Sequence, residues 1–250
     1  MTADWPYPSI FAHRGGGKLA PENTLAAIHL GQSLGFRAHE FDVKLSKDKV
    51  SLLLHDATLE RTTNGKGRAA DLTFAELEKL DAGDWHSEAF LGERLPSFER
   101  AARLLRSKDT MANIEIKPTP GFERETGLQV AAEAEKLWSG AAVQPLLSSF
   151  SFDALMAAKQ SAPSLRRGWL ADEIEDEDWT RLKTLGAVSM HTNYRKIRAG
   201  DIARLKGEGY RVMVYTVNEV QTAERLFDLG IDGLFTDNLR EFAAHFPGRI

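Results

Sequence analysis

The chain has 250 residues, of which 42% are hydrophobic, so it can bury one large core and is expected to form a single domain. Its 32 basic residues nearly balance 36 acidic ones without forming a basic block, which argues against a broad nucleic-acid surface because affinity for a phosphate backbone depends on clustered Lys and Arg. The absence of cysteine excludes disulfide frameworks, zinc–thiolate sites and a cysteine nucleophile.

The N-terminal segment, residues 1–8, lacks the charged stretch and apolar run of a secretion signal. No uninterrupted apolar run approaches the ~18 residues needed to cross a bilayer. We therefore expect a cytoplasmic protein with no membrane insertion. The oligomeric state is left open.

Short apolar, β-branched runs alternate with longer amphipathic runs along the chain, which is typical of repeated β-α units around a parallel sheet. The predicted strands are residues 9–13, 38–44, 50–55, 111–117, 145–149, 166–171, 187–192, 211–217 and 232–236. The predicted helices are residues 21–35, 96–107, 123–138, 151–162, 176–186, 198–209, 219–230 and 239–246. Pro21 is a predicted helix start, and the predicted helix ends are Gly35, Gly186, Gly209 and Gly230.

Nine predicted strands are one too many for an eight-stranded barrel. Residues 46–49 are far too few for a parallel crossover, so strands 38–44 and 50–55 should form an antiparallel hairpin in which one strand is an addition to the barrel. Residues 56–95 are expected to form a subdomain at the mouth. The predicted fold class is therefore α/β, a (β/α)8 TIM barrel over residues 1–250 with a small insertion at its C-terminal mouth.

The strongest local signal is Glu40-Phe41-Asp42. Alternate residues of a strand share a face, so both carboxylates project together. Two adjacent carboxylates repel unless a cation lies between them, and oxygen ligands suit Mg²⁺ or Ca²⁺ better than zinc. A surface strand with alternating polar residues is the competing interpretation.

The hairpin favours the metal site. If the turn is centred on Lys47 and Asp48, Asp42 pairs with Leu53 and Glu40 with His55, which places an imidazole beside the carboxylates. A shift of one residue in the loop would change this pairing.

A third carboxylate follows in a later predicted strand, where Glu115 and Lys117 share a face. Burying Glu115 inside the barrel is costly unless it is paired or bound to a metal. The alternative is a Glu115–Lys117 pair in solvent.

At the end of the first predicted strand, His13 and Arg14 precede three glycines, residues 15–17. Glycines permit close backbone approach to a ligand, and the guanidinium of Arg14 matches phosphate oxygens. Among the other histidines, His191 ends a later strand and could reach a substrate. Structural or solvent roles are expected for the histidines at positions 29, 86 and 245, and His39 should point away from its neighbour Glu40.

The acidic run at residues 172–178 is expected to be a solvated loop leading into a helix, where negative charge favours the N-terminus. It lacks the glycine and the spaced ligands of a calcium-binding loop.

Several ordered motifs together resemble the glycerophosphodiester phosphodiesterase family, and the surrounding sequence is most similar to its cytoplasmic bacterial enzyme. They are His13-Arg14-Gly15, Pro21-Glu22-Asn23-Thr24, Glu40-x-Asp42, His55-Asp56, Glu115-x-Lys117, Ser148-Ser149-Phe150, Tyr215-Thr216-Val217-Asn218 and Thr236-Asp237. The resemblance spans nearly the whole chain. It departs from the family pattern at Tyr215, where many members have tryptophan, and at Asn238, where a proline is common; both departures concern substrate fit.

The resemblance implies a role for each matched residue. It makes His13 and His55 the general acid and base, and Arg14 and Lys117 the phosphate contacts. The implied ligands of one divalent metal ion are Glu40, Asp42 and Glu115. His191 and Tyr215 are kept as possible substrate contacts.

The implied reaction converts a small-molecule glycerophosphodiester, such as glycerophosphocholine or glycerophosphoethanolamine, into sn-glycerol 3-phosphate and an alcohol. By family analogy, the glycerol 2-hydroxyl is favoured over water as the nucleophile, so that the alcohol leaves with formation of a cyclic phosphate, which water then opens. A lysophospholipase D or a sphingomyelinase D-like enzyme is the nearest alternative, and would need an apolar groove for an acyl chain. A catalytically inactive binding module is a further alternative, but no catalytic histidine or carboxylate is missing.

Overall fold

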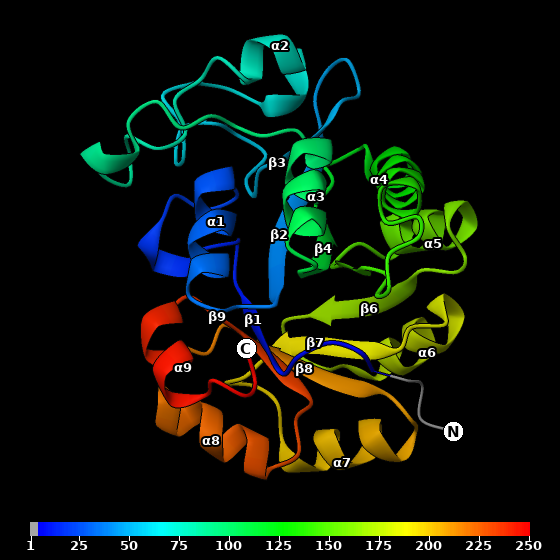
Figure 1. Cartoon of the computed structure of the whole chain (residues 1–250). Helices are drawn as coiled ribbons and strands as arrows, with labels where there is room; N and C mark the ends of the chain where they lie inside the picture. Colours follow the sequence, from blue (N-terminus) through cyan, green and yellow to red (C-terminus); the bar gives the residue numbers. More distant parts are fainter. Residues whose placement is uncertain (1–4) are drawn as a thin grey trace.

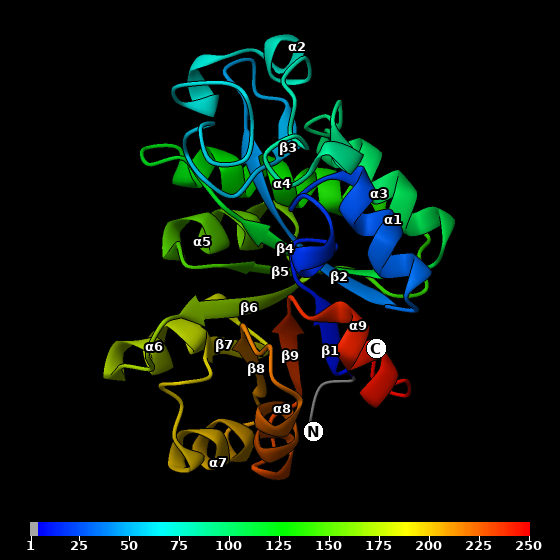
Figure 2. The ribbon, with the colours of Figure 1, turned by 90° about the vertical axis from the view of Figure 1, so that its left-hand side faces the viewer.

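The computed structural model describes residues 5–250, in which eight parallel strands form a closed barrel surrounded by helices (Figures 1 and 2). The barrel strands are β1 (Ile10–Ala12), β2 (Ala38–Leu45), β4 (Met111–Ile116), β5 (Leu146–Ser149), β6 (Arg166–Ala171), β7 (Ser189–Asn193), β8 (Arg211–Tyr215) and β9 (Gly233–Thr236). Strand β1 pairs with both β9 and β2, which closes the ring. The predicted (β/α)8 barrel is confirmed.

A helix follows each barrel strand before the next one begins, except that the hairpin and the insertion intervene after β2. These helices are α1 (Leu25–Ser33), α3 (Phe98–Ser107), α4 (Glu123–Leu137), α5 (Phe152–Ser161), α6 (Asp176–Leu185), α7 (Ala199–Gly207), α8 (Val220–Asp228) and α9 (Leu239–His245). The largest apolar cluster joins the strands to these helices. Within it the Phe41 and Phe98 rings lie 6.2 Å apart, and Phe98 stacks on Trp138.

Inside the barrel, a second apolar cluster is built largely from residues near the strand starts: Tyr7, Phe11, Ala38, Leu146, Met213 and Phe235. The opposite, C-terminal strand ends carry polar side chains instead. A polar pocket at that end therefore rests on an apolar floor, as is usual for this fold.

The predicted hairpin is confirmed, because β3 (Ser51–Leu53) pairs antiparallel with β2 outside the ring. The predicted register is wrong by one residue, since Leu53 pairs with Val43 instead of Asp42. The reason lies in the turn: Lys49 adopts a left-handed conformation with φ of 64° and adds a third residue to the loop, so that Ser46 pairs with Val50.

The insertion, residues 56–95, lies beside β3 at one end of the molecule (Figure 1). It contains the short helix α2 (Phe74–Leu77) and two 3-10 turns, η2 (Ala69–Asp71) and η3 (Glu88–Phe90). Together with Leu52 and Leu54, it forms a separate apolar cluster, whose other members are Leu59, Ala69, Leu77, Ala82 and Leu95. This cluster supports our proposal that the insertion is a subdomain of a single barrel domain.

Capping geometry sets the helix boundaries. Helix α1 starts at Leu25 and not at Pro21, because the Thr24 side chain accepts the Ala27 amide proton and caps the first turn. The four glycines predicted at helix ends all have positive φ and lie just after their helices.

The acidic run leads into α6 as predicted, with Asp176, Glu177 and Asp178 in the first turn. Asp178 is not solvated as expected, because it is buried and accepts a hydrogen bond from Trp169 Nε1 at 2.7 Å. Across residues 5–250, no helix has both the length and the apolar character needed to span a membrane.

Candidate active site

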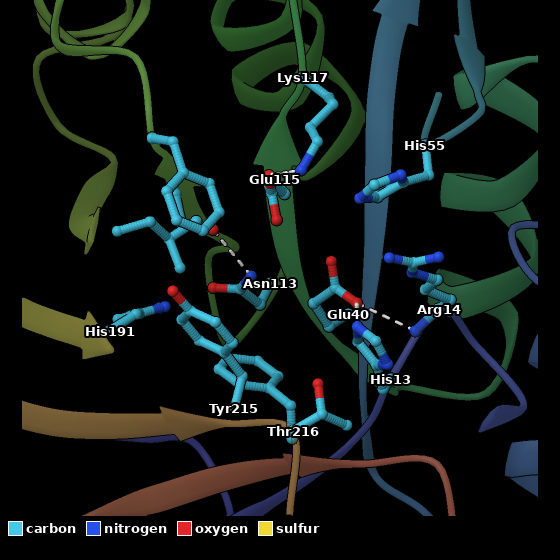
Figure 3. A pocket seen from close by; sticks show the side chains of 14 residues that line it. His13, Arg14, Glu40, His55, Asn113, Glu115, Lys117, His191, Tyr215 and Thr216 are labelled. Carbon is cyan, nitrogen blue, oxygen red and sulfur yellow. Dashed lines mark hydrogen bonds and ion pairs between the residues drawn. The ribbon is translucent and has the colours of Figure 1, made fainter. Parts of the chain in front are cut away.

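A cavity of about 220 Å³ opens at the C-terminal strand ends (Figure 3). Eight of the nine predicted site residues line it; the ninth, Asp42, belongs to the carboxylate group at its wall. The lining residues are His13, Arg14, Glu40, His55, Asn113, Glu115, Lys117, Ser148, Phe150, Leu170, His191, Tyr215, Thr216 and Phe235.

Three carboxylates form the centre of this wall. Asp42 and Glu115 lie at paired positions of neighbouring strands, and Glu40 is two residues before Asp42 on the same strand face. One oxygen from each lies within 4.8 Å of the others, and all three side chains are buried. Such a set fits a hard divalent cation, because buried negative charges at this spacing repel one another without one.

The pKa values of the three carboxyl groups are consistent with a cation site. Burial and the charge of Asp42 raise the pKa of Glu40 and of Glu115. Burial also acts to raise the pKa of Asp42, but the positive charges of His55, Arg14 and Lys117 outweigh it, and the net pKa is lowered. A metal ion would replace the protons that the raised pKa values favour.

Asn23 holds Asp42 in place, a role that the sequence did not reveal. Its side chain donates to Asp42 Oδ2 at 2.8 Å and accepts the Asp42 amide proton at 3.0 Å. Asn23 has a φ of 59°, a left-handed conformation that asparagine tolerates. Within the motif at residues 21–24, Asn23 therefore orients one of the three clustered carboxylates.

Each predicted catalytic histidine is held by a carboxylate at Nδ1. His13 Nδ1 lies 2.6 Å from Asp237 Oδ1, and His55 Nδ1 lies 2.7 Å from Asp56 Oδ1. Nε2 is therefore the nitrogen of each ring left for the pocket, and that of His13 is 3.9 Å from Glu40 Oε2. In the sequence, both aspartates are members of family motifs, but only Asp56, which directly follows His55, indicates such a contact.

The two imidazoles differ electrostatically. Burial acts to lower the pKa of His13, but its hydrogen bond to the Asp237 carboxylate and the charge of Glu40 raise it overall. Burial lowers the pKa of His55, and the opposing charge of Asp42 does not compensate. The predicted pairing of Glu40 with His55 does not form, because the paired residues of β2 and β3 end at Val43 and Leu53. His55 nevertheless lines the pocket together with Glu40.

Arg14 and Lys117 border the carboxylates. The Arg14 amide donates to Glu40 Oε2 at 2.9 Å, and its guanidinium donates to Glu22 at 2.7 Å. Lys117 Nζ lies 2.6 Å from Glu115 Oε1. The solvent-exposed alternative for Glu115 and Lys117 is excluded, since Glu115 is only 9% exposed.

His191 and Tyr215 line the side of the pocket across from His13 and Arg14 (Figure 3). His191 is fully buried, its Nε2 lies 2.9 Å from Ser189 Oγ, and burial lowers its pKa to about 3. Tyr215 donates its hydroxyl proton to the Ala171 carbonyl and packs edge-on against Phe150. Their contact with substrate stays a prediction.

The three glycines after Arg14 lie against other segments of the protein. A Cβ on Gly15 or Gly16 would meet helix α1 at Ala27, and one on Gly17 would lie 2.3 Å from the Asp237 carbonyl oxygen. These glycines therefore allow segments of the protein itself to pack closely, and an approach to a ligand stays a prediction.

His39, His86 and His245 do not line the pocket, in agreement with the structural or solvent roles expected for His86 and His245. His39 Nδ1 lies 3.1 Å from the Gly15 carbonyl, and His86 Nε2 lies 3.1 Å from the Lys18 carbonyl. His245 pairs with Glu224.

Known proteins are similar to this chain in both sequence and fold. The model of the glycerophosphoryl diester phosphodiesterase family matches residues 13–241. A glycerophosphodiester phosphodiesterase of Caldanaerobacter subterraneus subsp. tengcongensis is 36% identical over 233 residues, covering 92% of this chain and 93% of the relative. One from Bacillus subtilis is 30% identical over 244 residues, covering 90% and 82%.

Solved structures agree with these relatives. An Oleispira antarctica phosphodiesterase, solved in complex with the product sn-glycerol-3-phosphate, matches with a TM-score of 0.90 and 32% identity, covering 97% of this chain and 98% of that one. A glycerophosphodiester phosphodiesterase from Agrobacterium tumefaciens matches with a TM-score of 0.80 and 28% identity, covering 95% and 99%. With its family motifs gathered around one pocket, this chain belongs to the glycerophosphoryl diester phosphodiesterase family.

Proposed function

We propose that this protein hydrolyses small glycerophosphodiesters, such as glycerophosphocholine and glycerophosphoethanolamine, to sn-glycerol 3-phosphate and a free alcohol. The observation that carries the proposal is one pocket in which three buried carboxylates lie beside two histidines, each oriented by an aspartate. A relative of 32% identity was solved with sn-glycerol-3-phosphate as its product, which supports the same product here.

Glu40, Asp42 and Glu115 would hold one divalent metal ion, Mg²⁺ or Ca²⁺. When bound, the ion would neutralise charge that builds on the phosphoryl oxygens.

The cationic side chains Arg14 and Lys117 would hold the phosphate against this group, because both line the pocket next to the carboxylates. One histidine would take a proton from the nucleophile, and the other would give a proton to the leaving alcohol, in each case through Nε2. Asp56 and Asp237 would fix the tautomer and the direction of the two rings.

The pocket suits a small head group better than a lysophospholipid. Among residues 5–250, the exposed large hydrophobic side chains are Trp85, Leu91, Phe150 and Leu229, and only Phe150 lines the cavity. An acyl chain would need a longer apolar groove. On the basis of its cysteine-free composition, we infer a cytoplasmic enzyme.

The decisive experiment measures release of glycerol 3-phosphate with a coupled glycerol-3-phosphate dehydrogenase assay. Purified protein should turn over glycerophosphocholine or glycerophosphoethanolamine, lose this activity in EDTA and regain it with Mg²⁺ or Ca²⁺. Release of choline from lysophosphatidylcholine in preference to these substrates would favour the lysophospholipase D alternative. Absence of metal-dependent turnover on every substrate would exclude the proposed function.

A further inference from the structure

The carboxylates that support Arg14 and His55 share one cation from the insertion, Arg61. Glu22 accepts from Arg14 Nη1 at 2.7 Å, and Asp56 lies 2.7 Å from His55 Nδ1. Arg61 donates to both carboxylates: to the two Glu22 oxygens at 2.7 and 2.9 Å, and to the two Asp56 oxygens at 2.6 and 3.1 Å. One guanidinium therefore connects the supports of a phosphate-binding residue and a catalytic histidine.

Only arginine offers this connection. Its planar fork presents several N–H donors in fixed directions, so it can engage two carboxylates in a bidentate manner, whereas lysine is a single point charge. Without a cation between them, Glu22 and Asp56 would repel each other. Each carboxylate would then be free to shift, together with the Arg14 or His55 side chain that it holds.

Arg61 acts through these carboxylates and not on the substrate, because it is absent from the pocket lining. The backbone of the same segment is held separately: buried Lys44 donates from Nζ to the carbonyls of His55 and Asp56, at 3.0 and 2.5 Å. Loss of Arg61 should therefore displace side chains while the segment keeps its path.

We propose that Arg61 is a positioning residue that sets the relative placement of His55 and Arg14 and so couples the insertion subdomain to catalysis. This inference rests on the proposed function, in which His55 transfers a proton and Arg14 holds the phosphate. Through Arg61, the insertion would contribute to the chemistry as well as lie at the barrel mouth.

The test compares Arg61→Gln and Arg61→Lys with the wild type in the metal-supplemented coupled assay. Arg68→Gln serves as the matched control, since Arg68 is an exposed arginine of the same insertion and its loss changes the net charge equally. We expect kcat to fall about 10- to 100-fold in Arg61→Gln. Arg61→Lys should fall between this variant and the wild type, and Arg68→Gln should equal the wild type.

Two further measurements distinguish the proposed positioning role of Arg61 from a purely structural role. In a double-mutant cycle, adding Arg61→Gln to Asp56→Asn should lower kcat much less than Arg61→Gln does alone, because both changes break the same link. Exogenous guanidinium, at concentrations that leave the wild type active, should restore part of the kcat of Arg61→Ala.

Wild-type kcat in Arg61→Gln, or full additivity of the cycle, would overturn the inference. An inactive wild type would instead overturn the proposed function, so the two failures are distinguishable.

Discussion

His13 and Asp237 are 224 positions apart in the chain, yet their side chains meet at 2.6 Å. His13 follows β1 and Asp237 follows β9, and these strands are neighbours where the barrel closes. Asp237 is fixed in turn by Asn218, which accepts its amide proton at 2.7 Å and donates to Oδ2 at 3.1 Å. Closure of the barrel therefore creates an oriented imidazole at the pocket wall.

Asp237→Asn should lower kcat while the barrel stays folded. The amide keeps the size of the side chain but removes the charge that favours protonated His13 and fixes its tautomer. We expect kcat to fall by up to about 100-fold, a part of what general acid–base catalysis contributes, with a smaller change in KM. Steady-state kinetics together with circular dichroism would check this, and an unchanged kcat would remove Asp237 from the support of His13.

The features predicted from sequence are those set by local periodicity. The two-residue period of a strand was enough to place Glu40 with Asp42 and Glu115 with Lys117, because alternation operates within a few residues. The predicted hairpin register was wrong because the register depends on the φ of Lys49, which the residue type does not reveal.

Contacts between distant segments could not be predicted in the same way. Asn23 meets Asp42, and Arg61 meets Glu22, only because the barrel and its insertion bring separate loops together. No periodicity encodes such pairs. The family motifs indicated which of these residues mattered but not what they touch.

Metal binding should release protons and strengthen as pH rises. Burial and the charge of Asp42 raise the pKa of Glu40 and of Glu115, so the metal-free protein holds protons that a cation must displace. The apparent affinity for Mg²⁺ or Ca²⁺ should increase up to about tenfold per pH unit for each proton released. Calorimetry in two buffers of different ionisation enthalpy would count the protons, and a pH-independent affinity would argue against these ligands.

His13→Ala and His55→Ala should each lose turnover without losing metal binding. Both rings lie in the pocket outside the carboxylate group, so removing either one leaves the three oxygens in place. A positioned acid or base contributes about 10²- to 10⁴-fold, which is the expected range of the loss in kcat. Near-normal activity in either variant would remove that residue from the proton-transferring pair.

Gly17→Ala should damage both stability and activity. A Cβ there would lie 2.3 Å from the Asp237 carbonyl oxygen, so the turn that carries Asp237 must move away from His13. The overlap and the left-handed backbone, with φ of 56°, should together cost at least about 2 kcal/mol of unfolding free energy.

Gly67→Ala is the matched control for Gly17→Ala, because it has a φ of 84° but nothing within 4 Å of the added Cβ. It should lose some stability through backbone strain while its kcat stays at the wild-type value. Urea unfolding and the coupled assay on both variants would separate overlap from strain. Equal kcat in the two variants would show that the turn adapts without displacing Asp237.

The buried imidazole of His191 should make the protein less stable in acid. Burial lowers its pKa to about 3, well below the ~6.5 of an unfolded histidine, so between these values the unfolded state binds the extra proton. Its contribution to unfolding free energy is therefore intact above the unfolded pKa and falls by up to about 1.4 kcal/mol per pH unit as the pH decreases.

His191→Gln tests this prediction, because glutamine can retain a hydrogen bond to Ser189 but does not take up a proton in this pH range. The variant should be less stable than the wild type at about pH 7.5, and the difference in urea unfolding free energy should shrink steadily toward about pH 5. If the unfolding free energies of the two proteins changed in parallel with pH, His191 would take up a proton in the folded state as readily as in the unfolded state.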